Sequence, residues 1–278
     1  FVTALACLFL GIPVTESSGA QWSPIDQQLR VQMARAGVRP LDPGVFGSET
    51  MIELGQALFF DPILSGNRDI SCATCHHPSL ASGDGLPLPI GTGGEGLGVD
   101  RRRDPHRTFV SRNAPELFNR GALAWRNLFW DGRLEVLGDG SLRSPAGNLL
   151  PAQLNSLLAA QAMFPVTSRD EMRGRRGDPG NELALFPDED FEGIWAGLMD
   201  RLLEIPEYRE LFSEAFPGVT ANEFRFAHAA EALAAFQSTA FAAIDTPFDR
   251  YLRGENRALS LVEKRGALLF FGKARCAK

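Results

Sequence analysis

The sequence predicts a mainly helical fold with long loops. Several segments carry apolar residues at helical spacing, and no convincing run of alternating apolar and polar residues indicates a strand. Residues 82–100 and 172–182 are rich in glycine and polar residues and are expected to be loops, the second at the surface. Of the 278 residues, 44% are hydrophobic and 22% charged, which is ordinary for a soluble globular protein of one or two domains.

The N-terminus has the pattern of a secretory signal. Residues 4–14 are mostly apolar, and residues 18–20 (Ser-Gly-Ala) form a small-residue cleavage site. The apolar run is too short for a transmembrane helix, and a buried N-terminal strand is the alternative. We expect residues 1–20 to be a signal peptide remnant without its positive n-region, the mature protein to begin near Gln21, and the protein to be exported to the periplasm.

Five segments are expected to be helical. Residues 51–60 follow a capping box formed by Thr50 and Glu53, and Pro62 ends the helix. The other segments are residues 150–163, 190–216 (as one or two helices), 221–243 and 260–271. In the fourth segment, Phe224, Leu233 and Phe236 are expected on the apolar side. Residues 21–50 are expected to be a lead-in segment.

The net charge of the chain argues against nucleic acid as a partner. A net charge of −6 gives no reason to expect nucleic acid. Residues 101–103 are three consecutive arginines, which we expect to be a solvated loop or local partners of acidic side chains rather than a binding patch.

Residues 72–76 form a complete Cys-x-x-Cys-His motif, which is typical of c-type haem attachment. Two thiols one turn apart reach both vinyl groups of a haem, and the following imidazole then faces the iron. A redox dithiol would need a preceding strand, and a zinc site would need a second ligand pair. We therefore expect Cys72 and Cys75 to carry haem c covalently and His76 to ligate the iron, with His77 at the surface.

The motif has a partial echo at the end of the chain. Residues 55–60 before Cys72 are similar to residues 266–271 before Cys276. Ser260 and Glu263 form a capping box before the second helix, as Thr50 and Glu53 do before the first. The echo suggests a duplicated unit, in which Cys276 is the first cysteine of a second haem motif cut by the end of the chain.

Further motifs make the resemblance to a family specific. They are Leu58-Phe59-Phe60-Asp61-Pro62, Ser65-Gly66-Asn67, Ile70-Ser71-Cys72-Ala73-Thr74-Cys75-His76, Arg112-Asn113-Ala114-Pro115, Phe129-Trp130-Asp131-Gly132-Arg133 and Pro247-Phe248-Asp249-Arg250-Tyr251-Leu252. With them the chain resembles the bacterial di-haem cytochrome c peroxidase family, which includes the di-haem enzymes that mature methylamine dehydrogenase. The resemblance runs from about residue 54 to the C-terminus, in the family's order.

The resemblance implies two cytochrome c-like helical domains with one haem each. Peroxide reacts at the N-terminal haem, and the C-terminal haem receives electrons and passes them on. Residues 21–245 would form the N-terminal, peroxidatic haem domain with connecting helices. Residues 246–278 would be the beginning of the second haem domain, truncated before its haem motif is complete.

The resemblance also assigns roles to side chains. Trp130 matches a tryptophan that relays electrons between the haems, although a large core aromatic is the alternative; Asp131 and Arg133 would fix its turn. Gln161 and Glu171 match the loop over the peroxidatic haem. There, Glu171 would move a proton between the peroxide oxygens and Gln161 would orient ligand or water. The alternative for Glu171 is a solvated carboxylate in a charged stretch.

Three further residues have less specific matches. His106 lies six residues before Arg112. This is close to the position of a distal haem ligand in the classical peroxidases of the family, and a surface histidine is the alternative. Asn113 matches a position that helps to bind calcium between the domains, but one oxygen ligand is thin evidence for such a site. His228 is expected to be a core or surface histidine.

The resemblance implies an exported di-haem oxidoreductase that reduces hydrogen peroxide to water. The electrons would come from a small redox protein of the cytochrome c or cupredoxin type. One alternative is a di-haem enzyme that oxidises side chains of a partner protein, and another is a non-enzymatic electron carrier with two strong axial ligands. A homodimer is compatible with all of them, and no membrane-spanning segment is expected.

Overall fold

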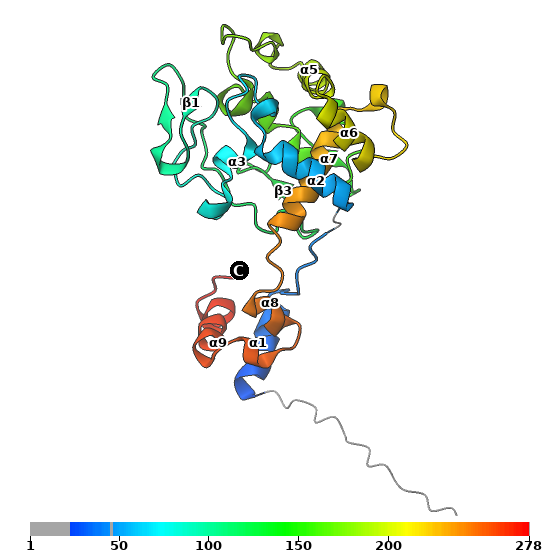
Figure 1. Ribbon diagram of the computed structural model, residues 1–278. Helices are drawn as coiled ribbons and strands as arrows, with labels where there is room; N and C mark the ends of the chain where they lie inside the picture. Colours follow the sequence, from blue (N-terminus) through cyan, green and yellow to red (C-terminus); the bar gives the residue numbers. More distant parts are fainter. Residues whose placement is uncertain (1–22, 45–46, 278) are drawn as a thin grey trace, which may run out of the picture. The chain divides into compact units, whose positions relative to one another are not determined.

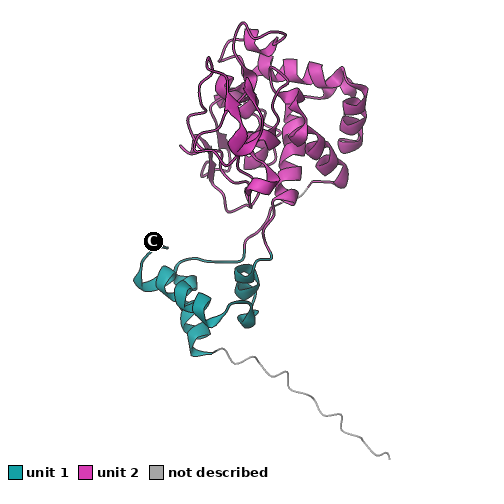
Figure 2. Ribbon diagram, turned by 60° about the vertical axis from the view of Figure 1, so that its left-hand side comes forward, with its two compact units in different colours: residues 1–40, 245–278 teal, residues 41–244 magenta. Residues whose placement is uncertain are grey.

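The computed structural model describes residues 23–44 and 47–277, and helices dominate these ranges. The chain divides into two compact units (Figure 2). Unit 1 contains the described residues up to 40 and those from 245 onward, and unit 2 contains the described residues between 41 and 244. The predicted signal segment, residues 1–20, and Gln21 lie outside the described residues.

Unit 2 is built around two helices, α2 (Glu49–Phe60) and α7 (Phe226–Ala240), which lie against each other (Figure 1). Gly55 permits this close approach, since a Cβ at this position would lie 1.9 Å from the Ala232 carbonyl oxygen. The remaining helices of the unit are α3 (Cys72–Cys75), α4 (Leu157–Ala162), α5 (Phe191–Leu203) and α6 (Pro206–Ala215).

The core of unit 2 comes from the apolar faces that the sequence predicts. Leu58 and Phe59 of α2 are almost fully buried, as are Leu233 and Phe236 on α7. Phe224, which precedes α7, is also buried. Burial of such side chains contributes roughly 1.5–3 kcal/mol each, so the α2–α7 contact is a main source of the stability of unit 2.

Short strands and tight helical turns join these helices. Strands β1 (Gly94–Glu95) and β2 (Arg102–Arg103) pair antiparallel, as do β3 (Asn127–Leu128), β4 (Leu134–Val136) and β5 (Leu142–Arg143) in that order. The 3-10 turns are Pro62–Leu64, Pro78–Leu80, Gly98–Asp100, Gly147–Leu149, Pro165–Thr167, Leu183–Leu185, Ala221–Glu223 and Asn256–Ala258, and π-helical turns cover Arg169–Arg173 and Leu269–Lys273. Strands of two or three residues are too short to show alternation in a sequence.

Several helix boundaries differ from the prediction; for example, α7 begins at Phe226 and not at residue 221. The N-cap of α2 is Ser48, whose Oγ accepts the Met51 N–H at 3.2 Å, rather than Thr50. The segment expected as a helix over residues 150–163 is helical only in α4, because Ser156 caps it late by accepting the Ala159 N–H at 3.0 Å. The predicted capping box of Ser260 and Glu263 is present.

Residues 172–182 do not form the simple surface loop that their composition predicts. Met172, Arg173 and Asn181 are buried. The Asn181 amide donates to the Arg173 carbonyl at 2.7 Å, and the Asn181 carbonyl oxygen accepts the Ala184 N–H at 3.0 Å. A polar residue that satisfies backbone groups from the inside gives no apolar signal in the sequence.

Unit 1 joins the two ends of the described chain. It contains α1 (Pro24–Arg35), α8 (Pro247–Leu252) and α9 (Leu261–Leu268). Leu29 and Met33 of α1 pack with Tyr251 and Leu259. Residues 23–40 therefore belong with the C-terminal segment, whereas the sequence places them in a domain of residues 21–245.

A buried polar cluster supports the same arrangement. Asp26 of α1 accepts hydrogen bonds from the Tyr251 hydroxyl at 2.9 Å and from Lys264 Nζ at 2.8 Å. These bonds, with one from Ser23, lower the pKa of the Asp26 carboxyl although burial acts to raise it. Within the ranges that the structure describes, none of the helices is both long and apolar enough to cross a membrane.

Candidate functional site

The two cysteines of the motif lie on α3, a single helical turn (Figure 1). The turn is held by a capping box, in which the Ser71 N–H donates to Thr74 Oγ1 at 3.0 Å. The His76 N–H donates to the Cys72 carbonyl at 2.9 Å and closes the turn. Cys72 and Cys75 are half-buried and not bonded to each other. Their spacing on one turn is the spacing that two thioether links to one haem require.

The thiols are not activated for redox exchange. Burial raises the pKa of Cys72 and of Cys75 to about 12, and the charges of Asp84 and Glu171 act in the same direction on Cys75. A catalytic dithiol needs the opposite, a cysteine pKa lowered toward neutrality. The environment of α3 therefore favours attachment of a cofactor over disulfide exchange.

The His76 ring is anchored by the loop that follows α3. Its Nδ1 lies 3.0 Å from the Ser82 carbonyl oxygen, and because a carbonyl only accepts, Nδ1 carries the proton. Burial lowers the pKa of His76, so the ring is neutral, as a metal ligand must be. An imidazole whose Nδ1 is held by a carbonyl presents Nε2 to a metal in a fixed orientation.

The loop that anchors His76 is itself fixed. Ala81 and Ser82 have left-handed backbone conformations, with φ angles of 52° and 59°. The Ser82 hydroxyl accepts the Leu117 N–H at 2.8 Å. This hydrogen bond ties the loop to the residues that directly follow the Arg-Asn-Ala-Pro segment. The free thiol pair and the oriented neutral imidazole fit a covalently bound haem c, with iron held by His76.

The structure gives no support to a zinc site. In residues 23–44 and 47–277, no three His, Cys, Asp or Glu side chains gather where they could hold a metal ion. Cys276 is exposed in unit 1, with its Sγ 3.8 Å from the Ala274 carbonyl oxygen. Its role as part of a second haem motif stays a prediction.

Glu171 lies on the π-helical turn Arg169–Arg173, against the glycine-rich loop that follows the haem motif. Its backbone carbonyl accepts the Thr92 N–H at 2.8 Å. A Cβ on Gly91 would lie 2.0 Å from the Asp170 carbonyl oxygen and 2.4 Å from that of Glu171. Only glycine permits this approach, which brings the residues after the haem motif directly onto the Glu171 turn.

The Glu171 carboxyl has an unusual proton affinity. Burial raises its pKa to about 7, the nearby charge of Asp170 adds to this shift, and Arg133 opposes it. The charge of Glu171 in turn acts on Cys75. Glu171 is therefore a half-buried acid of raised pKa within electrostatic reach of the haem motif.

Charged side chains hold the Glu171 turn from both sides. Arg175 donates to the His106 carbonyl at 2.7 Å and to the Asp170 carboxylate at 3.0 Å. Arg107 donates to Asp178 Oδ1 at 2.6 Å, and Asp178 Oδ2 accepts the Arg175 N–H at 2.8 Å. These bonds join the segment after β2 to the Glu171 turn, and they were not foreseen from the sequence because the partners are about 70 residues apart.

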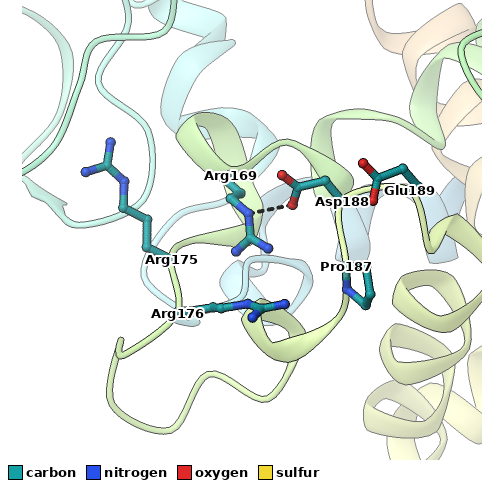
Figure 3. A pocket seen from close by; sticks show the side chains of 6 residues that line it. All are labelled: Arg169, Arg175, Arg176, Pro187, Asp188 and Glu189. Carbon is teal, nitrogen blue, oxygen red and sulfur yellow. Dashed lines mark hydrogen bonds and ion pairs between the residues drawn. The ribbon is translucent and has the colours of Figure 1, made fainter.

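A hollow of about 440 Å³ lies beside this turn (Figure 3). Its lining residues are Arg169, Arg175, Arg176, Pro187, Asp188 and Glu189. Arg169 Nε donates to Asp188 at 2.6 Å, and the buried Arg173 also donates to Asp188. The haem-motif residues and Glu171 do not line the hollow, so it is a separate surface feature.

Trp130 is 63% exposed, so it is not part of the core of unit 2. Its Nε1 donates to the Asn113 carbonyl at 2.9 Å, and the Asn113 amide donates to the Leu86 carbonyl at 2.6 Å. The indole is thus linked to the loop after the haem motif. Its turn is held by Asp131, which accepts hydrogen bonds from the backbone and side chain of Arg133.

The other predicted site residues are placed less specifically. Gln161 is half-buried on α4, and in the described chain no hydrogen bond joins it to Glu171. His106 is exposed on the turn that Arg175 anchors. Asn113 uses its amide nitrogen for the Leu86 carbonyl, and a calcium site there stays a prediction. The ligand role of His106 also stays a prediction.

His77 and His228 make local contacts only. His77 Nδ1 lies 2.8 Å from the Ser79 hydroxyl at the edge of the loop. His228 packs against Phe216, with ring centroids 4.9 Å apart, and its Nδ1 accepts the Arg225 N–H at 3.0 Å. Neither side chain contacts the haem motif.

Arg101 is the main polar residue of the site that sequence reasoning misplaced. It is 5% exposed and not part of a solvated basic run. Its Nε, Nη1 and Nη2 donate to the carbonyls of Ile90, Gly96 and Gly91, each at 2.8 Å. A glycine-rich loop has few side chains of its own to fill its interior, and the long side chain of Arg101, at the end of the loop, takes this place. The density of glycines was the feature of the sequence that could have indicated a buried Arg101.

Comparisons with known proteins show the family of the chain. A family model described as "Di-haem cytochrome c peroxidase" matches residues 49–257. The chain is 35% identical over 227 residues to the methylamine utilization protein MauG of Methylorubrum extorquens, covering 81% of this chain and 48% of that protein. It is 30% identical over 224 residues to the cytochrome c551 peroxidase of Pseudomonas aeruginosa, covering 80% and 48%.

A solved structure shows the same fold. The crystal structure of a MauG-like protein associated with microbial copper homeostasis superposes with a TM-score of 0.51 and 26% identity, covering 84% of this chain and 53% of the other. The chain spans about half the length of the curated relatives it matches. With the family match extending over most of the chain, the haem motif and the helical fold around it have one consistent explanation: the chain belongs to the di-haem cytochrome c peroxidase family.

Proposed function

We propose that this chain provides the peroxide-reacting haem domain of an exported di-haem peroxidase. The overall reaction would be H₂O₂ + 2 H⁺ + 2 e⁻ → 2 H₂O, with the electrons supplied by a small redox protein. The observation that carries the proposal is the half-buried carboxyl of Glu171, whose pKa is raised to about 7 by desolvation, within electrostatic reach of Cys75. The family membership supports the same reaction.

The proposal gives Glu171 the proton transfer. When bound, haem would supply the iron and the two electrons that split peroxide. Glu171 would take a proton from one peroxide oxygen and give it to the other, which would leave as water. A carboxyl whose pKa is close to the working pH can both accept and return a proton, and such catalysis contributes about 10²–10⁴-fold.

The surrounding residues would serve positioning and electron supply. Gln161 would orient the peroxide or a water molecule. Trp130 would pass electrons from a second haem, whose motif would begin at Cys276. The exposure of Trp130 supports this role, because an indole at the surface of unit 2 is available to a neighbouring domain.

The first prediction tests the role of Glu171 directly. The Glu171→Gln variant of the haem-loaded protein is expected to keep its haem and to lose peroxide turnover by about 10²-fold or more. Turnover is measured as peroxide-dependent oxidation of a reduced cytochrome, and haem content by its absorption after reduction. Glu189→Gln, an exposed carboxyl of the neighbouring hollow, is the matched control and is expected to be unchanged. Normal turnover in Glu171→Gln would contradict the proton-transfer role of Glu171.

A second candidate function is the oxidation of a partner protein's side chains. It is favoured by the 35% identity to MauG, the relative named for methylamine utilization. Consumption of peroxide with reduced cytochrome alone supports the peroxidase, whereas consumption only in the presence of a dedicated protein substrate supports the second function. Low-spin iron in every redox state, with no reaction toward peroxide, would instead favour a simple electron carrier.

A further inference from the structure

Asp84 is a buried carboxylate close to the haem motif that the proposed reaction does not use. Its side chain is 2% exposed. Oδ1 accepts the Leu86 N–H at 3.0 Å, but Oδ2 is buried and has no hydrogen-bond partner in the described residues. Buried charged groups in folded proteins are paired or hydrogen-bonded, because an unpaired charge is costly in a low dielectric. An orphaned oxygen therefore indicates a compensating charge that the polypeptide does not supply.

Arg101 offsets the charge of Asp84 only at a distance, without a hydrogen bond to it. Its charge reaches Asp84, yet all three of its nitrogen groups donate to carbonyls of the glycine-rich loop. Within residues 23–44 and 47–277, no hydrogen-bond donor reaches Asp84 Oδ2. The hydrogen bonds of the Arg101 guanidinium hold the loop, and Oδ2 of the carboxylate is left without a direct partner.

The chain connectivity places Asp84 next to the histidine that would ligate iron. The Ser82 carbonyl is 3.0 Å from His76 Nδ1, and the Gly83 carbonyl accepts the His77 N–H at 2.9 Å. Since successive Cα atoms are about 3.8 Å apart, the Cα of Asp84 lies within ~7.6 Å of that of Ser82.

We propose that the unpaired carboxylate of Asp84 lowers the reduction potential of the haem held by Cys72, Cys75 and His76. Taking up one electron removes one positive charge from the ferric haem. A fixed negative charge in a buried environment therefore stabilises the ferric state relative to the ferrous state. In this role Asp84 acts through its charge alone, without contact to peroxide or to the iron.

The inference depends on haem attachment and is independent of the proton transfer proposed for Glu171. It would hold equally for a peroxidase, for an enzyme that oxidises a partner protein, and for an electron carrier. A failure of the Glu171 assignment therefore leaves it intact, and its own test measures a potential and not a rate.

The test is a spectroelectrochemical titration of the haem-loaded protein and its variants. Asp84→Asn, which keeps the shape and the acceptor for Leu86, is expected to shift the midpoint potential of this haem to a more positive value. Asp84→Glu, which keeps the charge, is expected to stay closer to the wild type than Asp84→Asn. Asp100→Asn removes an exposed carboxyl of the same loop and is expected to leave the potential unchanged.

The outcomes separate charge from structure. Haem-loaded Asp84→Asn with an unchanged potential overturns the proposal, as does an equally large shift in Asp84→Glu or in Asp100→Asn. Asp84→Ser provides a second charge-free variant in case Asp84→Asn takes up no haem, and it too is expected to shift the potential upward. If neither charge-free variant takes up haem while Asp84→Glu does, the carboxylate serves assembly and the proposal is wrong.

Discussion

At the scale of single residues, local sequence predicts a haem-binding group but not its surroundings. Cys72, Cys75 and His76 could be predicted because the chemistry of haem attachment fixes their spacing on one short helical turn. The burial of Arg101 could not be predicted, because the neighbouring sequence does not distinguish an arginine that binds backbone carbonyls from a solvated one. The raised pKa of Glu171 likewise depends on burial by loops that are distant in sequence.

Trp130 allows a test of the electron path at this scale. Trp130→Phe is expected to leave folding and haem content unchanged, because the side chain is largely exposed, and to slow turnover with a reduced electron donor. The matched control is Trp125→Phe, since Trp125 is also exposed and donates its Nε1 to a backbone carbonyl, that of Asn119, at 2.9 Å. Equal effects of the two substitutions would contradict a specific relay through Trp130.

At the scale of elements, the apolar periodicity predicted the paired helices α2 and α7 but missed α1 and the short strands. The pairing of α2 with α7 follows from faces such as Leu58 and Leu233, which periodicity reveals. Ser48 rather than Thr50 caps α2, because both residue types cap helices and only the backbone geometry decides between them. The first helix, α1, lies in a segment expected to be only a lead-in, and its burial depends on partners more than 200 residues away.

The approach of the glycine-rich loop to the Glu171 turn gives a prediction about these elements. In Gly91→Ala the new Cβ would meet the Asp170 and Glu171 carbonyls, so the turn must move. A displacement of about 1 Å at a catalytic group can cost ~10²-fold in rate, and we expect a loss of this order in peroxide turnover with haem retained. Gly138→Ala is the control, since a Cβ there meets no atom within 4 Å. Wild-type turnover in Gly91→Ala would argue that this contact does not position Glu171.

At the scale of the whole molecule, the family motifs predicted the family but not the division into units. They run through both units, and the family match spans residues 49–257. The division itself could not be read from the sequence, because unit 1 joins residues 23–40 to residues from 245 onward through side chains such as Leu29 and Tyr251. Predictions from linear motifs assign contiguous ranges and miss a unit built from both ends of a chain.

The pH dependence of the peroxide reaction tests the central claim most directly. Burial raises the pKa of Glu171 to about 7, and the carboxylate, which accepts the proton, is the form present above that value. The rate constant for peroxide reacting with the haem-loaded protein, measured by rapid mixing between about pH 5 and 9, is expected to rise with pH through about 7. In Glu171→Gln the rate is expected to be low and without this transition. A wild-type profile that is flat around pH 7, or a transition that persists unchanged in Glu171→Gln, would contradict the account.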